Sequence, residues 1–208
     1  MHLDGLGRAA HYRNMSSEKN RSEGVGADPR ALRALAHPVR LDLLYLLQRE
    51  GPLTATRAAE LLDLTPKVCS YHLGLLGKHG IIEETGAGSG RARPWRVAER
   101  DINYHHRPDE EPAMTHAQDA FASTMLARDR QVIETFIVQR HQLPNTWRNV
   151  ATMSSNPLRL TPEQLRELRT ELHAVLERYQ AISQTPDPNA QPVHAALYAV
   201  PALNSGKD

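Results

Sequence analysis

The sequence predicts a mainly α-helical protein that carries one small β-hairpin. Apolar residues recur at helical spacing over much of the 208-residue chain, which favours helices as the dominant element. A β-branched run from Ile81 to Thr85 is followed by a loop of Gly, Ser and Arg and then by a second short run, which predicts the hairpin. Hydrophobic residues make up 40% of the chain and aromatic residues only 5%, so the expected core is mostly Leu, Ala and Val.

Two helices are expected before residue 53. Asp28-Pro29 caps the first, because the aspartate oxygen accepts a free backbone N–H and proline fits the first helical position. His37-Pro38 interrupts it, and Val39 to Arg49 forms a second helix that is apolar almost all round, as is typical for the centre of a small domain. Gly51-Pro52 ends this helix, and residues 53–55 are expected to form a short strand beside the hairpin.

A pair of short helices joined by a tight turn follows. Thr56 is predicted to cap the first of them. Its expected buried face consists of Ala58, Ala59, Leu61 and Leu62. Asp63-Leu64 is the turn, and Thr65-Pro66 begins the second helix. Gly80 is expected to end that helix in a left-handed conformation.

The second helix of the pair divides into two faces. The predicted inner face consists of Val68, Cys69, His72, Leu73, Leu75 and Leu76, and the outer face of Lys67, Ser70, Tyr71, Gly74 and Lys78. The hairpin follows, with Arg91 and Arg93 at its Gly-rich tip. Two helices followed by such a hairpin predict a winged helix-turn-helix, whose second helix fits the major groove of DNA. A solvated loop is the alternative interpretation of the tip.

The polar side chains of this unit are candidate DNA contacts. Lys67, Ser70 and Tyr71 are expected to face base edges or nearby phosphates, and Thr65 to donate to a phosphate from the helix N-terminus. Arg91 and Arg93 would reach a phosphate or the minor groove. Lys78 is a weaker candidate, with a solvated charge as its alternative.

Three segments resemble the ArsR type of winged-helix regulators. They are His37 to Leu41 (HPVRL), Ala58 to Leu61 (AAEL) and Ser70 to Ile82 (SYHLGLLGKHGII), and the resemblance covers about residues 30–100. It implies a homodimeric repressor that binds an inverted-repeat operator and responds to an effector. It also implies that His72 lies near the DNA backbone, with a packed histidine as the alternative, and that Arg40 is structural.

The chain departs from the metal-sensing members of that family. Cys69 is its single cysteine, whereas soft-metal sites need two to four thiolates, so a buried apolar role is expected for it. His105, His106 and His116 have no helical i, i+4 spacing. We therefore expect no metal and no cofactor.

The C-terminal half predicts a helical region. Met114 to Gln142 has the pattern of a long helix, and Thr161-Pro162 opens another with a capping box. An apolar seam with spacings of 3 and 4 runs along the latter: Leu165, Leu168, Leu172, Val175, Tyr179 and Ile182. This seam either packs on the first long helix or meets a second copy, and dimerisation is favoured. Val193 to Val200 is expected to form a strand.

These patterns divide the chain into five parts. The expected parts are a disordered tail (1–27), the winged helix-turn-helix domain (28–104), a linker (105–113), a helical dimerisation or effector region (114–203) and a short tail (204–208). A small-molecule effector is considered because the third to fifth parts extend far beyond the DNA-binding fold. Met114, Phe121, Met125, Trp147 and Met153 would either line its cavity or form core.

Charge and motifs bound the function. The formal net charge is +1, and residues 28–107 carry 12 Lys and Arg against 9 Asp and Glu, so the basic side coincides with the candidate DNA-binding unit. One cysteine, no long apolar stretch and no signal-peptide core favour a cytoplasmic protein outside the membrane. No catalytic motif is present, so a non-enzymatic regulator that binds double-stranded DNA is expected. The alternative is a winged-helix module for protein interaction or small-molecule sensing.

Overall fold

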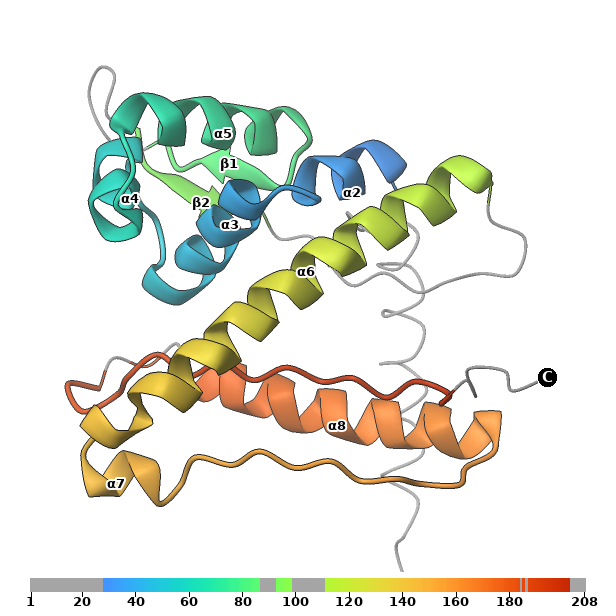
Figure 1. Ribbon diagram of the computed structural model, residues 1–208. Helices are drawn as coiled ribbons and strands as arrows, with labels where there is room; N and C mark the ends of the chain where they lie inside the picture. The colour runs from blue at the N-terminus through green and yellow to red at the C-terminus, as the bar shows by residue number, and fades with distance from the viewer. Residues whose placement is uncertain (1–27, 87–92, 99–110, 184, 186, 203–208) are drawn as a thin grey trace, which may run out of the picture. The chain divides into compact units, whose positions relative to one another are not determined.

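The computed structural model describes residues 28–86, 93–98, 111–183, 185 and 187–202 (Figure 1). It is mostly helical with one two-stranded antiparallel hairpin, which confirms the predicted fold class. The elements are α2 (Pro29–Leu35), α3 (Pro38–Glu50), α4 (Ala55–Leu62), α5 (Pro66–Lys78), β1 (Ile82–Glu84), β2 (Trp95–Val97), α6 (Pro112–Gln139), α7 (Asn145–Arg148) and α8 (Pro162–Ser183). The predicted tails at 1–27 and 204–208 lie outside the described residues.

Local sequence signals place the starts of three helices. The Asp28 side chain accepts the Arg30 N–H at 2.8 Å at the start of α2. Thr65 caps α5 in the same way, with its Oγ1 3.3 Å from the Val68 nitrogen. At α8, Thr161 and Gln164 exchange both bonds of the predicted capping box.

One predicted cap is wrong. Thr54, not Thr56, caps α4, and its side chain accepts the Arg57 N–H. The reason is tertiary, because Leu53 bridges to Trp95 in two backbone hydrogen bonds of 2.8 and 3.0 Å. The chain leaves this bridge at Thr54 in an extended conformation, so the helix can begin at once.

The core of the winged unit is aliphatic, as its composition predicted. The buried side chains come from α2 to α5, β1 and the first part of α6, and the largest fully buried ones are Leu32, Leu35, Leu41, Leu43, Leu44, Leu73, Leu76, Ile81 and Ile82. β1 lies against α5 and β2 against α3, so the hairpin is held between helices (Figure 1). This packing fixes which face of α5 is left to solvent.

The hairpin is seated by a close contact with α5. β1 and β2 pair with Ile82 opposite Val97 and Glu84 opposite Trp95. A Cβ atom at Gly77 would lie 2.5 Å from Cζ3 of Trp95, so only glycine lets the indole ring approach the helix this closely. Gly80 follows with a φ of +64°, the left-handed conformation expected after the helix.

The first part of α6 packs on the winged unit. Phe121 is buried in the core, and Met114 and Met125 pack against it. Arg128 donates to Asp42 at 2.9 Å, and its guanidinium lies 4.1 Å from the centroid of the Tyr45 ring. These contacts join α6 to α3 through both apolar and charged groups.

The described residues form two compact units that divide between Gln131 and Val132. The second contains the end of α6, a 3₁₀ turn at Arg140–Gln142, α7 and α8. The strand expected from Val193 to Val200 is wrong, because this segment pairs with no other strand among the residues described. Val193 and Val200 stay 73% and 77% exposed, so burial does not stabilise a strand there. Within the described ranges, none of the helices has both the length and the apolarity that crossing a membrane requires.

Candidate nucleic-acid interface

The two faces of α5 differ sharply in exposure. The face of α5 that packs on the core contains Cys69, Leu73 and Leu76, which are fully buried. On the opposite face Lys67 and Ser70 are exposed, and Tyr71 is 64% exposed. The first turn of α5 contains no acidic residue, so no negative side chain there would repel a DNA phosphate. It presents one cation, one hydroxyl and one phenol close to the helix N-terminus.

Two apolar residues expected inside lie on the surface instead. Val68 and Leu61 are each 38% exposed, so the prediction that they belong to buried faces is wrong. The buried positions of α5 follow 4- and 3-residue steps from Cys69, and Val68 is about 100° away from that line around the helix. Val68 therefore joins the outer face, where an apolar group of this kind can touch a thymine methyl.

Thr65 combines capping with an available donor. Its oxygen accepts the Val68 N–H, while the hydroxyl proton can still be donated to an anion. The residue is exposed at the helix N-terminus, where the backbone dipole also favours negative charge.

His72 is packed against a second histidine. The rings of His72 and His37 lie 4.7 Å apart between centroids, and the ring of Tyr71 lies 5.1 Å from that of His72. The Nδ1 atoms of both histidines are buried, with no hydrogen-bond partner among the described residues. Burial, and then the charge of Arg40, lowers the pKa of His37; burial, followed by His37 and Arg40, lowers the pKa of His72. Both rings are thus favoured in the neutral form.

Arg40 is held inside the winged unit. Its Nε donates to the backbone carbonyl of Ala34, at the end of α2. The guanidinium is therefore engaged between α2 and α3, next to the histidine pair.

The two arginines of the hairpin that the structure describes each pair with a glutamate of the hairpin. Arg93 lies 3.0 Å from a Glu84 carboxylate oxygen, and Arg96 lies 2.6 Å from one of Glu83. All four side chains are substantially exposed, so these pairs are weak and can exchange for a phosphate. Arg91, the other predicted hairpin contact, lies outside the described residues.

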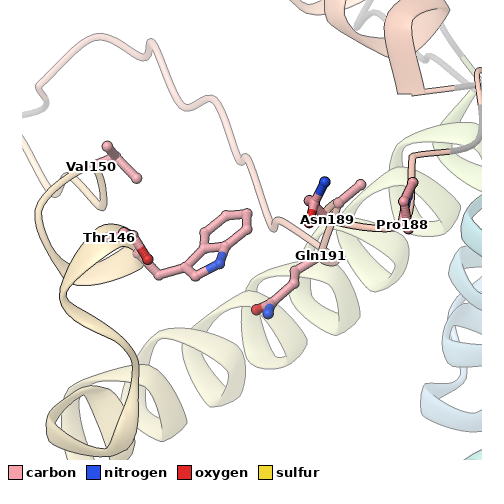
Figure 2. A pocket seen from close by; sticks show the side chains of 7 residues that line it. Thr146, Val150, Pro188, Asn189 and Gln191 are labelled. Carbon is pink, nitrogen blue, oxygen red and sulfur yellow. The ribbon is translucent and has the colours of Figure 1, made fainter.

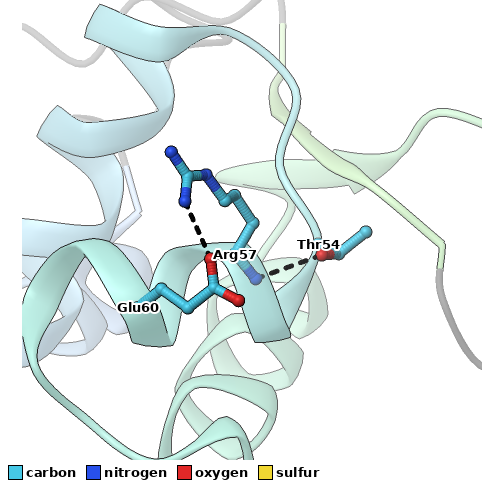
Figure 3. Close-up of polar contacts among 3 residues, drawn as sticks. All are labelled: Thr54, Arg57 and Glu60. Atoms are coloured by element: carbon cyan, nitrogen blue, oxygen red, sulfur yellow. Dashed lines mark hydrogen bonds and ion pairs between the residues drawn. The ribbon is translucent and has the colours of Figure 1, made fainter.

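The N-terminus of α4 adds two polar residues, Thr54 and Arg57, that the sequence patterns did not single out. Arg57 donates to Glu60 at 2.8 Å, and its backbone N–H is held by Thr54 (Figure 3). In a helix-turn-helix the first helix crosses the DNA backbone, so an exposed arginine in this turn has the position of a phosphate contact. The available signal was Thr54 itself, an N-cap residue type directly before the helical run, and the choice of Thr56 as the cap obscured it.

Lys78 ends α5 on the exposed side. A cation in the last turn complements the negative end of the helix dipole, which gives this residue a structural role in addition to any DNA contact.

The described residues contain no cluster of three or more His, Cys, Asp or Glu side chains that could hold a metal ion. Cys69 is buried, and burial raises the pKa of its thiol. His105 and His106 lie outside the described residues.

The second unit contains an open depression with a volume of about 680 Å³. Trp147, Thr146 and Val150 line it on one side, and residues 188–191 on the other (Figure 2). Of the five residues considered for an effector cavity, only Trp147 contributes. Phe121, Met114 and Met125 instead belong to the core of the first unit.

Comparison with known families agrees with this geometry. A model of a helix-turn-helix domain family matches residues 35–85, the stretch from the end of α2 to the end of β1. No curated protein matches the chain. A helix-turn-helix domain is a DNA-binding unit, which indicates a transcription regulator.

Proposed function

We propose that this chain is a transcriptional repressor of the ArsR type that binds an inverted-repeat operator as a homodimer. The observation that carries the proposal is the exposed face of α5, where Lys67, Ser70 and Tyr71 stand opposite the buried Cys69 and Leu73. The helix cannot turn this face inward without exposing its apolar side, so these polar groups remain available to DNA.

The contacts divide into two kinds. Lys67, Ser70 and Tyr71 meet base edges in the major groove and supply sequence discrimination. Thr65, Lys78, Arg91 and Arg93 meet phosphates and position the domain. His72 follows Tyr71 in the chain, and its ring packs against the Tyr71 ring. Its proposed place near the DNA backbone rests on the family resemblance.

The second unit is proposed to provide the dimer contact and the response to an effector. An inverted repeat requires two recognition helices related by a two-fold axis, which one winged unit does not supply. The depression beside Trp147 is the candidate site for a small molecule.

The direct experiment is to select fragments of the organism's own DNA with the purified chain and to measure binding to the enriched sequence at several salt concentrations. We expect an enriched inverted repeat, and an affinity that falls steeply with salt because phosphate contacts release counterions. A winged-helix module for protein contact, the alternative function, would enrich no sequence. The absence of enrichment together with salt-independent behaviour would therefore reject the proposal.

A further inference from the structure

The apolar seam of α8 is open to a partner. None of the residues of α8 is buried, and Val175, Tyr179 and Ile182 are 43%, 59% and 58% exposed. Leu165, Leu168 and Leu172 are only half-buried. The alternative in which this seam packs inside its own chain therefore leaves much of its apolar surface in water, among the residues that the structure describes.

The spacing of the seam makes it complementary to itself in one direction. When two copies of α8 run antiparallel, Leu165 lies opposite the partner's Ile182, and Leu168 opposite the partner's Tyr179. Leu172 then lies opposite the partner's Val175, so every seam residue meets another apolar residue in one register. The two-fold axis passes through the middle of the helix, which gives the isologous contact typical of dimers.

The charges beside the seam favour the same direction. Glu171 and Arg178 flank it on one side, and both are exposed. The guanidinium of Arg178 lies 5.3 Å from the Tyr179 ring centroid, which places this charge at the edge of the seam. In the antiparallel register Glu171 of each copy faces the partner's Arg178, so two opposite-charge pairs form.

The parallel arrangement lacks these advantages. There each seam residue meets its own copy, so Tyr179 faces the partner's Tyr179. Glu171 would face the partner's Leu176, and no charge beside the seam would find an opposite one.

We propose that α8 binds the α8 of a second copy of this chain in an antiparallel pair. This inference rests on the homodimer of the proposed function and specifies which surface forms it and in which orientation. The seam spans only about two and a half heptads, so the pair contributes to a larger dimer interface and does not form it alone.

Site-specific cross-linking tests the orientation. Leu165→Cys and Ile182→Cys chains, co-expressed with different affinity tags, are treated with a short bismaleimide. We expect a cross-link between the two variants and none when either variant is present alone. Positions 165 and 182 lie about 25 Å apart along one helix, so two copies of the same variant hold their new thiols about that far apart in the antiparallel pair, beyond the reach of a short bismaleimide. The wild-type chain, whose Cys69 is buried, is the control.

Two outcomes would overturn the inference. Self-linking of either single variant would show a parallel pair, and the absence of any link in a dimeric, DNA-binding protein would show that α8 is not at the interface. A chain that is monomeric and binds no operator would instead reject the proposed function, so the two failures can be told apart.

A charge exchange gives an independent readout. Glu171→Arg or Arg178→Glu alone creates two like-charge pairs, and we expect the dimer dissociation constant to rise by about tenfold in analytical ultracentrifugation. The double exchange should restore it to within about threefold. Glu177→Arg, on the outer side of the helix, is the matched control. Failure of the double variant to recover contradicts the antiparallel pairing.

Discussion

His37 and His72 make the stability of the winged unit depend on pH. Burial lowers the pKa of both rings from the ordinary value of 6.5, so the two histidines bind protons less readily in the folded chain than in the unfolded chain. Stability is therefore full above about pH 6.5 and falls as the pH drops through 6.5 toward the lowered pKa values.

This dependence is measured by urea unfolding between pH 5 and pH 8. We expect the free energy of unfolding of the His72→Gln variant to fall less between pH 8 and pH 5 than that of the wild type, because glutamine does not titrate. Replacement of the exposed His141 by glutamine should leave the profile close to that of the wild type. Equal profiles for all three proteins would contradict a role for the histidine pair.

Arg93 tests whether the hairpin touches DNA phosphates. In the free protein it is paired with Glu84, and we expect it to exchange that carboxylate for a phosphate. The Arg93→Ala variant should bind every DNA sequence more weakly and reduce the salt slope by about one. Binding is measured by fluorescence anisotropy over a salt series, with Arg30→Ala as the control. A loss confined to one base-pair position would show a base contact instead.

At the scale of elements, Gly77 and Gly74 form a matched pair within α5. A Cβ at Gly77 would overlap the Trp95 ring, whereas a Cβ at Gly74 has no atom within 4 Å. We expect Gly77→Ala to destabilise the protein by about 1–3 kcal/mol by displacing the hairpin. Gly74→Ala should stabilise it by about 0.5–1 kcal/mol, because alanine is the better helix former. Thermal unfolding measures both, and a similar gain in the two variants would contradict the Trp95 contact.

The sequence was sufficient for elements whose ends carry local chemistry. Asp28-Pro29, Thr65-Pro66 and the Thr161 capping box lie where their side chains predicted, because a cap is satisfied within a few residues. Thr54 was missed because its role depends on the Leu53–Trp95 bridge, which joins residues far apart in the chain. Val193 to Val200 has strand composition but no edge to pair with among the described residues, and local pattern does not reveal that.

The candidate DNA contacts could be predicted from spacing only in part. Periodicity placed Lys67, Ser70 and Tyr71 on the outer face of α5, and the structure exposes all three. Periodicity placed Val68 on the buried face of α5, which is wrong. The buried face is narrow and contains fewer of the helix's apolar residues than the sequence predicted. The pairing of Arg93 with Glu84 depends on hairpin register, which the loop sequence does not specify.

At the scale of the whole molecule, the two units present different kinds of surface. The winged unit buries most of its aliphatic residues and exposes polar groups on α5, whereas the described part of the second unit leaves several large apolar residues exposed, among them Val138, Met153 and Leu158. Exposed apolar surface is typical of segments that bind a partner. This contrast is consistent with the proposal that the first unit contacts DNA and the second provides the dimer contact.

The central claim is that the outer face of α5 discriminates between DNA sequences. The most direct measurement compares the affinity of a Lys67→Ala/Tyr71→Ala variant for the selected operator with its affinity for a scrambled duplex, with Lys78→Ala as a phosphate-contact control. Each lost base contact costs roughly 1–3 kcal/mol, so we expect operator discrimination to fall by at least about thirtyfold in the double variant and to stay unchanged in the control. Full operator affinity in a folded double variant would contradict the account.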